Sequence, residues 1–264
     1  MVDLGPALDL SRWQLDVVHE GTCLVVARGT EPRTRRPVAV RTPRSGAELG
    51  AQRLAAAVTV EASVGRHARL APVLLAGGRG GGCALVTPWY PATLTELPGP
   101  HGVPAVAARG TALATALVAL HGAGLVHGEI DPNAVFVDED GAPVLGRLHA
   151  CRPPGPRSRL RLSACTAPEA LRGADVAAAE DVYALAAVLV HALTGEPLLH
   201  RWPGEADAGF ALRLLGVDPS PRPSWGGLAP VLTRCLDPDP GRRPSAAELA
   251  AQLVRWAAVR GRPG

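Results

Sequence analysis

Apolar and polar positions divide this chain into a first part with the pattern of strands and a second part with the pattern of helices. Over residues 13–45, short runs of β-branched and other apolar residues alternate with turn residues, which predicts a strand meander. An alanine-rich segment with spaced charges predicts a helix over residues 46–66. Two further strands are expected near Ala71–Leu75 and Ala84–Thr87, on either side of the glycine run at 77–82. The first 90 residues therefore predict a small sheet with one helix.

The rest of the chain has the longer apolar runs that are typical of helices. A turn at Asp140-Gly141 predicts a hairpin of two short strands. Ser245, with Glu248 three positions later, predicts a capping box at the start of the last helix. The expected helices cover Val103–His121, Ala179–Leu193, 208–215, 226–236 and 245–260, and the hairpin strands cover Ala134–Val137 and Pro143–Leu145.

A lobe rich in strands followed by a helical lobe is an α+β architecture. The length of 264 residues is enough for two lobes that share an interface. We expect a leader over 1–12, the first lobe over 13–90, the second lobe over 91–260 and a tail over 261–264.

Composition narrows the classes of function. Apolar residues make up 47% of the chain and aromatic residues 3%, which predicts a globular protein with a core of aliphatic side chains. The net charge of +3 is too small to indicate a nucleic-acid partner, and we expect none. All 27 basic residues are arginine, so no step that requires a lysine amine can occur here.

Cysteine usage and the apolar stretches predict a cytoplasmic protein. The five cysteines are far apart and form no C-x-x-C pair, so neither a zinc site nor a disulfide framework is indicated. The start of the chain lacks the basic and then apolar run of a signal peptide. The apolar stretch Ala112–Leu120 is too short to cross a bilayer, so no membrane span is expected.

Residues 120–135 read LHGAGLVHGEIDPNAV and are similar to the catalytic loop of serine/threonine protein kinases, whose pattern is H-R-D-L-x-x-x-N. Other landmarks of the family occur in the family's order, so the resemblance spans roughly residues 13–258. They are Val38-Ala39-Val40-Arg41 for the V-A-I-K strand, Ala167-Pro168-Glu169 for the end of the activation segment, Glu180–Leu185 for the buried helix after it, and Cys235–Ser245 for the C-terminal landmark. The resemblance implies a bilobal kinase-like fold.

The resemblance also implies structural roles for four residues. His127 corresponds to a buried histidine of the family's core, and Asp181 to the aspartate that braces the backbone of the catalytic loop. Glu169 and Arg243 correspond to a buried ion pair between the activation segment and the C-terminal helices. These residues support the fold and say nothing about catalysis.

The positions that carry phosphoryl transfer in the family hold other residues here. Arg147 replaces the first metal-binding aspartate and Ala134 replaces the second metal ligand, an asparagine, so no metal ligand is expected. Glu129 stands at the position of the catalytic base, with a side chain one methylene longer. Arg41 stands at the position of the lysine on the phosphates, and Asp131 reverses the charge of a second phosphate-binding lysine.

Several residues match a nucleotide pocket. The Gly-rich loop is reduced to Gly21, while apolar walls, a gatekeeper and a hinge correspond to Leu24, Ala39, Phe136, Thr87, Pro88 and Tyr90. The resemblance thus permits binding of ATP without magnesium, but we expect no cofactor, because the same apolar residues would equally line a pocket that is empty or filled by the protein itself. The glutamate that would pair with Arg41 is open between Glu61 and a register that places Val58 there.

Arginines supply two further hypotheses. The guanidinium of Arg147 would replace the metal and bridge Glu129 or Asp131 across the cleft; the alternative is an exposed arginine on a degenerate loop. The loop 150–166 carries four arginines and would dock an acidic or phosphorylated protein partner, although such runs are more often solvated loops.

The favoured interpretation is a catalytically inactive kinase-like domain, a pseudokinase, that acts as a signalling scaffold or regulatory binding module. One alternative is an active serine/threonine kinase or other ATP-dependent phosphotransferase with Glu129 as base. Another is a regulatory domain of a larger membrane protein, because related bacterial kinases often have a membrane span after the domain.

Overall fold

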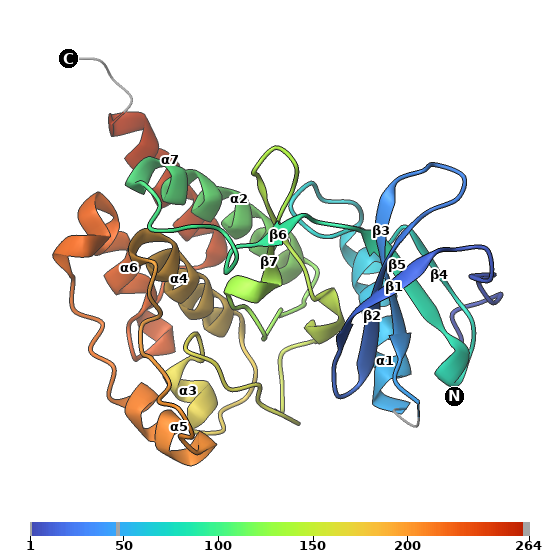
Figure 1. The fold of residues 1–264 in the computed structure, drawn as a ribbon. Coiled ribbons are helices and arrows are strands. Elements are labelled where there is room, and N and C mark those ends of the chain that lie inside the picture. Colours follow the sequence, from blue (N-terminus) through green and yellow to red (C-terminus); the bar gives the residue numbers. More distant parts are fainter. Residues whose placement is uncertain (1, 46–47, 261–264) are drawn as a thin grey trace.

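The computed structural model describes residues 2–45 and 48–260, and it has a strand-rich lobe and a helical lobe (Figure 1). This confirms the expected α+β architecture with two lobes. The first two residues of the predicted 46–66 helix and the predicted tail 261–264 lie outside the described residues.

The strand-rich lobe contains a five-stranded antiparallel sheet with the strand order β1-β2-β3-β5-β4. The first three strands form the predicted meander, and α1 follows them before the chain returns to the sheet. The bounds are β1 Leu15–Glu20, β2 Leu24–Thr30, β3 Pro37–Pro43, α1 Glu48–Val64, β4 Leu75–Gly77 and β5 Ala84–Pro88.

The strand expected at Ala71–Leu75 was placed too early. The structure begins β4 at Leu75, where Leu75 pairs with Val86. Just before it, Ala71 donates its N–H to the Leu145 carbonyl of the other lobe at 2.9 Å. This stretch is extended because it joins the two lobes, which its apolar pattern does not distinguish from a strand in a sheet.

The two faces of the sheet are covered by different segments. Helix α1 packs on one face, where Leu54 and Val60 are buried. On the other face, Val38, Val40 and Val86 are covered by apolar side chains that include those of Leu8, Leu10 and Trp13. The segment expected as a leader over 1–12 therefore contributes, in its described part, to the packing of this lobe.

The helical lobe is built around α2, Val103–Gly122, which packs against α4, Ala178–Thr194, and α7, Ala246–Arg260. Gly110 allows their close approach, because an added Cβ would lie 2.9 Å from methyl groups of both Leu189 and Leu253. By length and composition α2 could cross a membrane, but a core helix of this kind passes the same test. The remaining strands and α-helices are β6 Ala92–Thr93, β7 Val135–Val137, β8 Pro143–Leu145, α3 Pro168–Leu171, α5 Asp207–Leu215 and α6 Ala229–Cys235.

Local signals in this lobe were mostly confirmed. The Asp140-Gly141 turn joins β7 to the antiparallel β8. Ser245 and Glu248 form the predicted capping box, with the Ser245 N–H donating to Glu248 at 2.8 Å and the Glu248 N–H to Ser245 Oγ at 3.2 Å. The helix predicted over 226–236 was too long at its start: Gly226 has φ 52°, and α6 begins after this kink, at Ala229.

Candidate functional site

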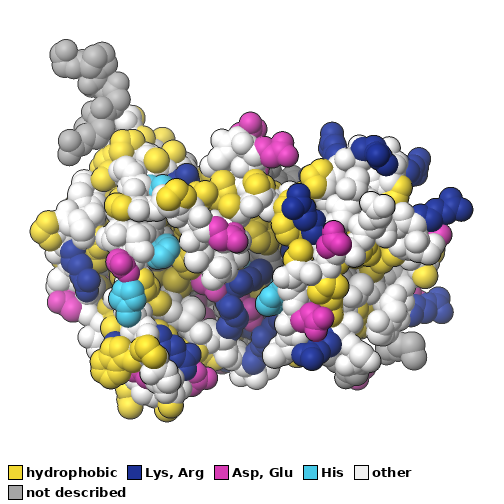
Figure 2. Space-filling model, in the orientation of Figure 1, with side chains coloured by type: hydrophobic (Ala, Val, Ile, Leu, Met, Phe, Trp, Pro, Cys, Tyr) yellow, Lys and Arg dark blue, Asp and Glu magenta, His cyan; other side chains and the backbone are white. Residues whose placement is uncertain are grey.

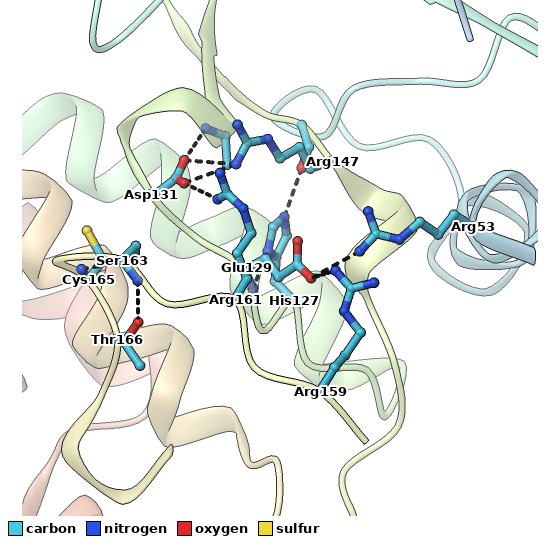
Figure 3. Close-up of polar contacts among 12 residues, drawn as sticks. Arg53, His127, Glu129, Asp131, Arg147, Arg159, Arg161, Ser163, Cys165 and Thr166 are labelled. Carbon is cyan, nitrogen blue, oxygen red and sulfur yellow. Dashed lines mark hydrogen bonds and ion pairs between the residues drawn. The ribbon is translucent and has the colours of Figure 1, made fainter. Parts of the chain in front are cut away.

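The loop that resembles a catalytic loop lies between α2 and β7, where side chains of the two lobes meet. Figure 3 shows Glu129 of this loop between Arg53 and Arg159, and Asp131 facing Arg147 and Arg161. The site is thus a cluster of two carboxylates and four guanidinium groups.

Asp181, at the start of α4, holds the backbone of this loop. Its side chain is 1% exposed and accepts hydrogen bonds from the N–H groups of His127 and Gly128, both at 2.8 Å. His127 is fully buried, with Nε2 2.8 Å from the Gly146 carbonyl and Nδ1 3.3 Å from the Glu129 N–H. A neutral imidazole with its proton on Nε2 satisfies both contacts. These are the bracing contacts that the resemblance implied for the two residues.

The ion pair expected between Glu169 and Arg243 is present and bidentate. Arg243 Nη1 and Nη2 lie 2.6 and 2.7 Å from the two carboxylate oxygens. Arg243 also donates to the carbonyls of Asp237 and Ala179, and its guanidinium lies 4.9 Å from the centre of the Tyr183 ring. The pair connects α3 with the segment that precedes α7.

Glu129, at the position of the catalytic base, is paired with arginines of both lobes. Its side chain is 4% exposed, and its Oε1 accepts hydrogen bonds from Arg53 of α1 at 3.4 Å and from Arg159 at 3.3 Å. A substrate hydroxyl would have to displace these guanidinium groups to reach that oxygen. The Arg53–Glu129 contact is an ion pair between the two lobes.

Asp131 is also paired with arginines. Arg147 Nη1 lies 3.1 and 3.0 Å from its two oxygens, Arg161 donates to Oδ2, and the Ala134 N–H donates to Oδ1 at 2.9 Å. Burial opposes ionisation of this carboxyl group, but Arg147 and Arg161 outweigh burial and hold its pKa below the ordinary value. Asp131 is therefore an anion whose main partners are arginines of its own lobe.

The contact between Arg147 and Asp131 confirms one part of the hypothesis for Arg147. The other part is wrong, because Arg147 and Asp131 both belong to the helical lobe and their bond does not cross the cleft. The ion pair that reaches this site from the other lobe is made by Arg53 instead. Arg147 has φ 54° and ψ 33°, a left-handed backbone that costs a non-glycine residue about 1–2 kcal/mol. Its carbonyl accepts from the Ala150 N–H at 2.8 Å, which holds this conformation.

Replacing Arg53 with glutamine is expected to loosen the contact between the lobes. The change leaves Arg159 on Glu129, so the loss of unfolding free energy should be only about 1 kcal/mol. Amide hydrogen exchange in α1 should become faster, because the ion pair that holds this helix to the catalytic loop is gone. Arg66→Gln is the matched control, since Arg66 is exposed and has no ion pair among the described residues. Equal exchange rates in α1 of both variants would contradict the expected result.

Arg41, at the position of the phosphate-binding lysine, has no ion-pair partner within the described part of the chain. Its Nη1 donates to Thr87 Oγ1 at 2.7 Å. Neither candidate for the partner glutamate reaches it, because Glu61 accepts the Val73 N–H at 2.6 Å and Val58 has no charge. Burial and the nearby Arg147 lower the pKa of Arg41 to about 10, so the guanidinium remains charged at neutral pH.

A small cavity lies beside Arg41, and Thr87, Phe136, Arg147 and His149 are among the residues that line it. Its volume of about 20 Å³ is room for roughly one water molecule. Burial, and then the surrounding cationic groups Arg53, Arg41 and Arg147 together with His127, lower the pKa of His149 to about 3. His149 is therefore neutral at physiological pH.

The residues predicted to form a nucleotide pocket lie around the junction of the lobes. Leu24, Ala39 and Thr87 are buried. Tyr90 and Phe136 stack with ring centres 5.0 Å apart, which connects the hinge with the helical lobe. The Pro88 carbonyl, expected to face adenine, accepts the Thr87 hydroxyl at 3.3 Å. Gly21 is part of a tight turn between β1 and β2, in which its N–H donates to the Leu24 carbonyl at 2.9 Å.

The residues at the two metal-ligand positions do not fit a magnesium ion. Ala134 has no side-chain donor atom and is fully buried. Arg147 places a cation next to Asp131, where a divalent ion would need carboxylate oxygens. Within residues 2–45 and 48–260, no group of three or more His, Cys, Asp or Glu side chains is placed to hold a metal ion.

The arginines of the loop 150–166 are mostly engaged within the chain. Arg157 pairs with Glu180 of α4, while Arg159 and Arg161 pair with the two site carboxylates. For this loop the sequence predicted either a docking surface or a solvated loop, and neither prediction included these ion pairs or the role of Arg53. The sequence shows the arginines of the loop but not their partners, because these lie 23–30 residues away along the chain. Docking of a partner at this loop remains a prediction.

Comparison with known proteins finds relatives of one kind, although no protein-family model matches the chain. The chain is 33% identical over 179 residues to the serine/threonine-protein kinase AfsK of Streptomyces coelicolor, a match that covers 64% of this chain and 22% of that protein. It is 30% identical over 213 residues to the serine/threonine-protein kinase PknK of Mycobacterium tuberculosis, a match that covers 76% of this chain and 19% of that protein.

The chain thus spans about a fifth of the length of these curated relatives. The matches cover most of the chain, and the structure has the strand-rich lobe and the helical lobe in the order that the catalytic-loop motif implied. This chain is therefore related to the bacterial serine/threonine protein kinases and has a bilobal, protein-kinase-like fold.

Proposed function

We propose that this kinase-like domain is a pseudokinase, which binds other proteins in signalling and transfers no phosphoryl group. The observation that carries the proposal is the bond between Arg147 and Asp131. Phosphoryl transfer depends on metal ions that neutralise the charge of the transferring group. At this position the chain has a guanidinium group bound to a carboxylate, and the second ligand position is the apolar Ala134.

The state of the base position supports the same proposal. Glu129 is buried, and its Oε1 accepts hydrogen bonds from two arginines. A general base must lie within hydrogen-bonding distance of the proton it removes. In this arrangement Glu129 joins α1 of one lobe to the loop 150–166 of the other, which is a structural use of the carboxylate at the base position.

The proposal includes weak binding of a nucleotide without a metal, because apolar residues remain at the positions that would contact adenine. Leu24 and Ala39 would contact an adenine ring, and Arg41 supplies a positive charge for a phosphate group without a metal. Binding of this kind would be weak, because the metal-ligand positions add no anchor.

Thermal unfolding with ATP, in the presence and absence of Mg²⁺ or Mn²⁺, tests the proposal. We expect that either metal adds no stabilisation beyond that of ATP alone, because no residue at the two ligand positions can coordinate it. A radiolabel transfer assay on the same samples should show no incorporation into the chain or into a generic protein substrate. Metal-dependent stabilisation, together with transfer that Glu129→Ala abolishes, would show an active kinase and overturn the proposal.

A further inference from the structure

A group of arginines at one end of the sheet forms no ion pair among the described residues, unlike the paired arginines of the cleft. Figure 2 shows dark blue side chains gathered at the upper end of the strand-rich lobe, where β2 and β3 are joined in Figure 1. We call this group the hairpin patch. It consists of Arg28 near the end of β2 and of Arg33, Arg35 and Arg36 in the turn that leads to β3.

The arginines of the hairpin patch form no ion pair within residues 2–45 and 48–260. All four arginine residues are exposed, and none forms an ion pair there, whereas Arg53, Arg147 and Arg161 of the cleft each do. The one acidic residue of the turn, Glu31, forms no ion pair with these arginines, and its carboxylate accepts the backbone N–H groups of Arg33 and Thr34. The patch therefore presents four guanidinium groups to an outside anion.

The backbone of the turn and the side chain of Arg28 are held in place. Arg28 lies over the ring of Trp89, 5.0 Å from its centre, and the Trp89 N–H donates to the Pro37 carbonyl at the start of β3 at 3.1 Å. Arg35 has φ 59°, and the Arg35 N–H donates to the Glu31 carbonyl at 2.8 Å. A guanidinium group has a planar fork that binds carboxylates in a bidentate manner. The turn therefore presents its arginines from a defined backbone, and Arg28 loses little freedom when an anion binds.

Next to the patch lies the open edge of the sheet. β1 is the outermost strand, and its outer side has no strand neighbour among the described residues. Asp16 of β1 lies opposite Arg28, and the next positions along the strand, Val17 and Val18, are 58% and 49% exposed. An edge of this kind offers unpaired N–H and C=O groups, and extended peptides bind such edges by adding a strand.

From these features we infer that β1 and the hairpin patch together form a docking site for an extended acidic segment of a partner protein. Its backbone would pair with β1, its apolar side chains would cover Val17 and Val18, and its carboxylates would reach the arginines. An anionic membrane fits less well, because lipid tails cannot bond the unpaired backbone groups of β1. Single-stranded nucleic acid also fits less well, because Arg28 already covers the ring of Trp89 on which a base would stack. This site does not depend on whether the cleft transfers phosphate.

Fluorescence anisotropy with the whole chain tests the inference. The probe is a labelled peptide of about ten residues in which glutamate and valine alternate, a length at the upper end of the usual range for strands. Binding should weaken by about tenfold in the variant Arg33→Gln/Arg35→Asn/Arg36→Gln, which removes three exposed charge contacts. Asparagine is used at position 35 because it tolerates the left-handed backbone there.

The matched control removes the same charge from the helical lobe. Arg172→Gln/Arg234→Gln/Arg255→Gln replaces three exposed arginines and should change the affinity by less than about twofold, because distant charges are screened by salt. Amide hydrogen exchange of Leu15–Val18 in the unmodified chain should become slower when the peptide is bound.

Three results would overturn the inference. Equal weakening in the two triple variants would show that net charge alone attracts the peptide. Unchanged exchange in β1 would exclude strand addition. Tighter binding of single-stranded DNA, or of vesicles that contain phosphatidylglycerol, with loss of that binding in the patch variant, would assign the patch to a different class of partner.

Discussion

Replacing Arg243 with methionine is expected to lower the free energy of unfolding by about 3–5 kcal/mol. The Arg243 side chain is fully buried and that of Glu169 is 11% exposed, so the change leaves a carboxylate in the protein interior without its two charged hydrogen bonds. The carbonyls of Asp237 and Ala179 also lose their donor. Denaturation in urea measures the loss, which is a large part of the total stability of a typical domain.

The control for this prediction is the neighbouring arginine. Arg242 is exposed and pairs with Asp239 at the surface, so Arg242→Met should cost less than about 1 kcal/mol. The double variant Glu169→Leu/Arg243→Met should recover part of the loss, because a buried pair that is removed as a whole leaves no unpaired charge. A double variant as unstable as Arg243→Met alone would show that the two carbonyl contacts, and not the ion pair, account for the effect.

Lowering the pH from 7 to 5 is expected to destabilise the protein by about 2 kcal/mol through His149. The pKa of His149 is about 3 in the folded protein, below the value of 6.5 in an unfolded chain. The unfolded chain therefore binds a proton first as the pH falls. The stabilisation is complete above pH 6.5 and is lost progressively as the pH falls towards 3.

His149→Gln isolates this contribution. The pKa values of His101 and His191 are also lowered, chiefly by burial, so the parent protein contains contributions from other histidines. The measured quantity is the difference between the unfolding free energies of parent and variant, which should shrink by about 2 kcal/mol between pH 7 and pH 5. His19→Gln, at an exposed position on β1, is the control and should leave the pH dependence unchanged. Parallel curves for His149→Gln and the parent would contradict the prediction.

Much of the fold was predictable, because its signals are local. The hairpin around Asp140-Gly141 and the capping box of Ser245 and Glu248 each depend on residues a few positions apart, and both are present. The error at β4 has the opposite cause. Residues near Ala71 are apolar and extended, but the Ala71 N–H bonds the other lobe, and a pattern along the chain does not say which lobe an extended segment pairs with.

Periodicity and motifs at fixed spacing were enough to predict the order of the lobes, the kinase-like landmarks, and Ala134 and Arg147 at the metal-ligand positions. Which arginines hold the site carboxylates depends on how the chain folds in three dimensions. Arg53 is 76 residues from Glu129 and Arg161 is 30 residues from Asp131. An ion pair depends on the distance between charges in space, and in a chain with 27 basic residues many other pairings would satisfy the same sequence.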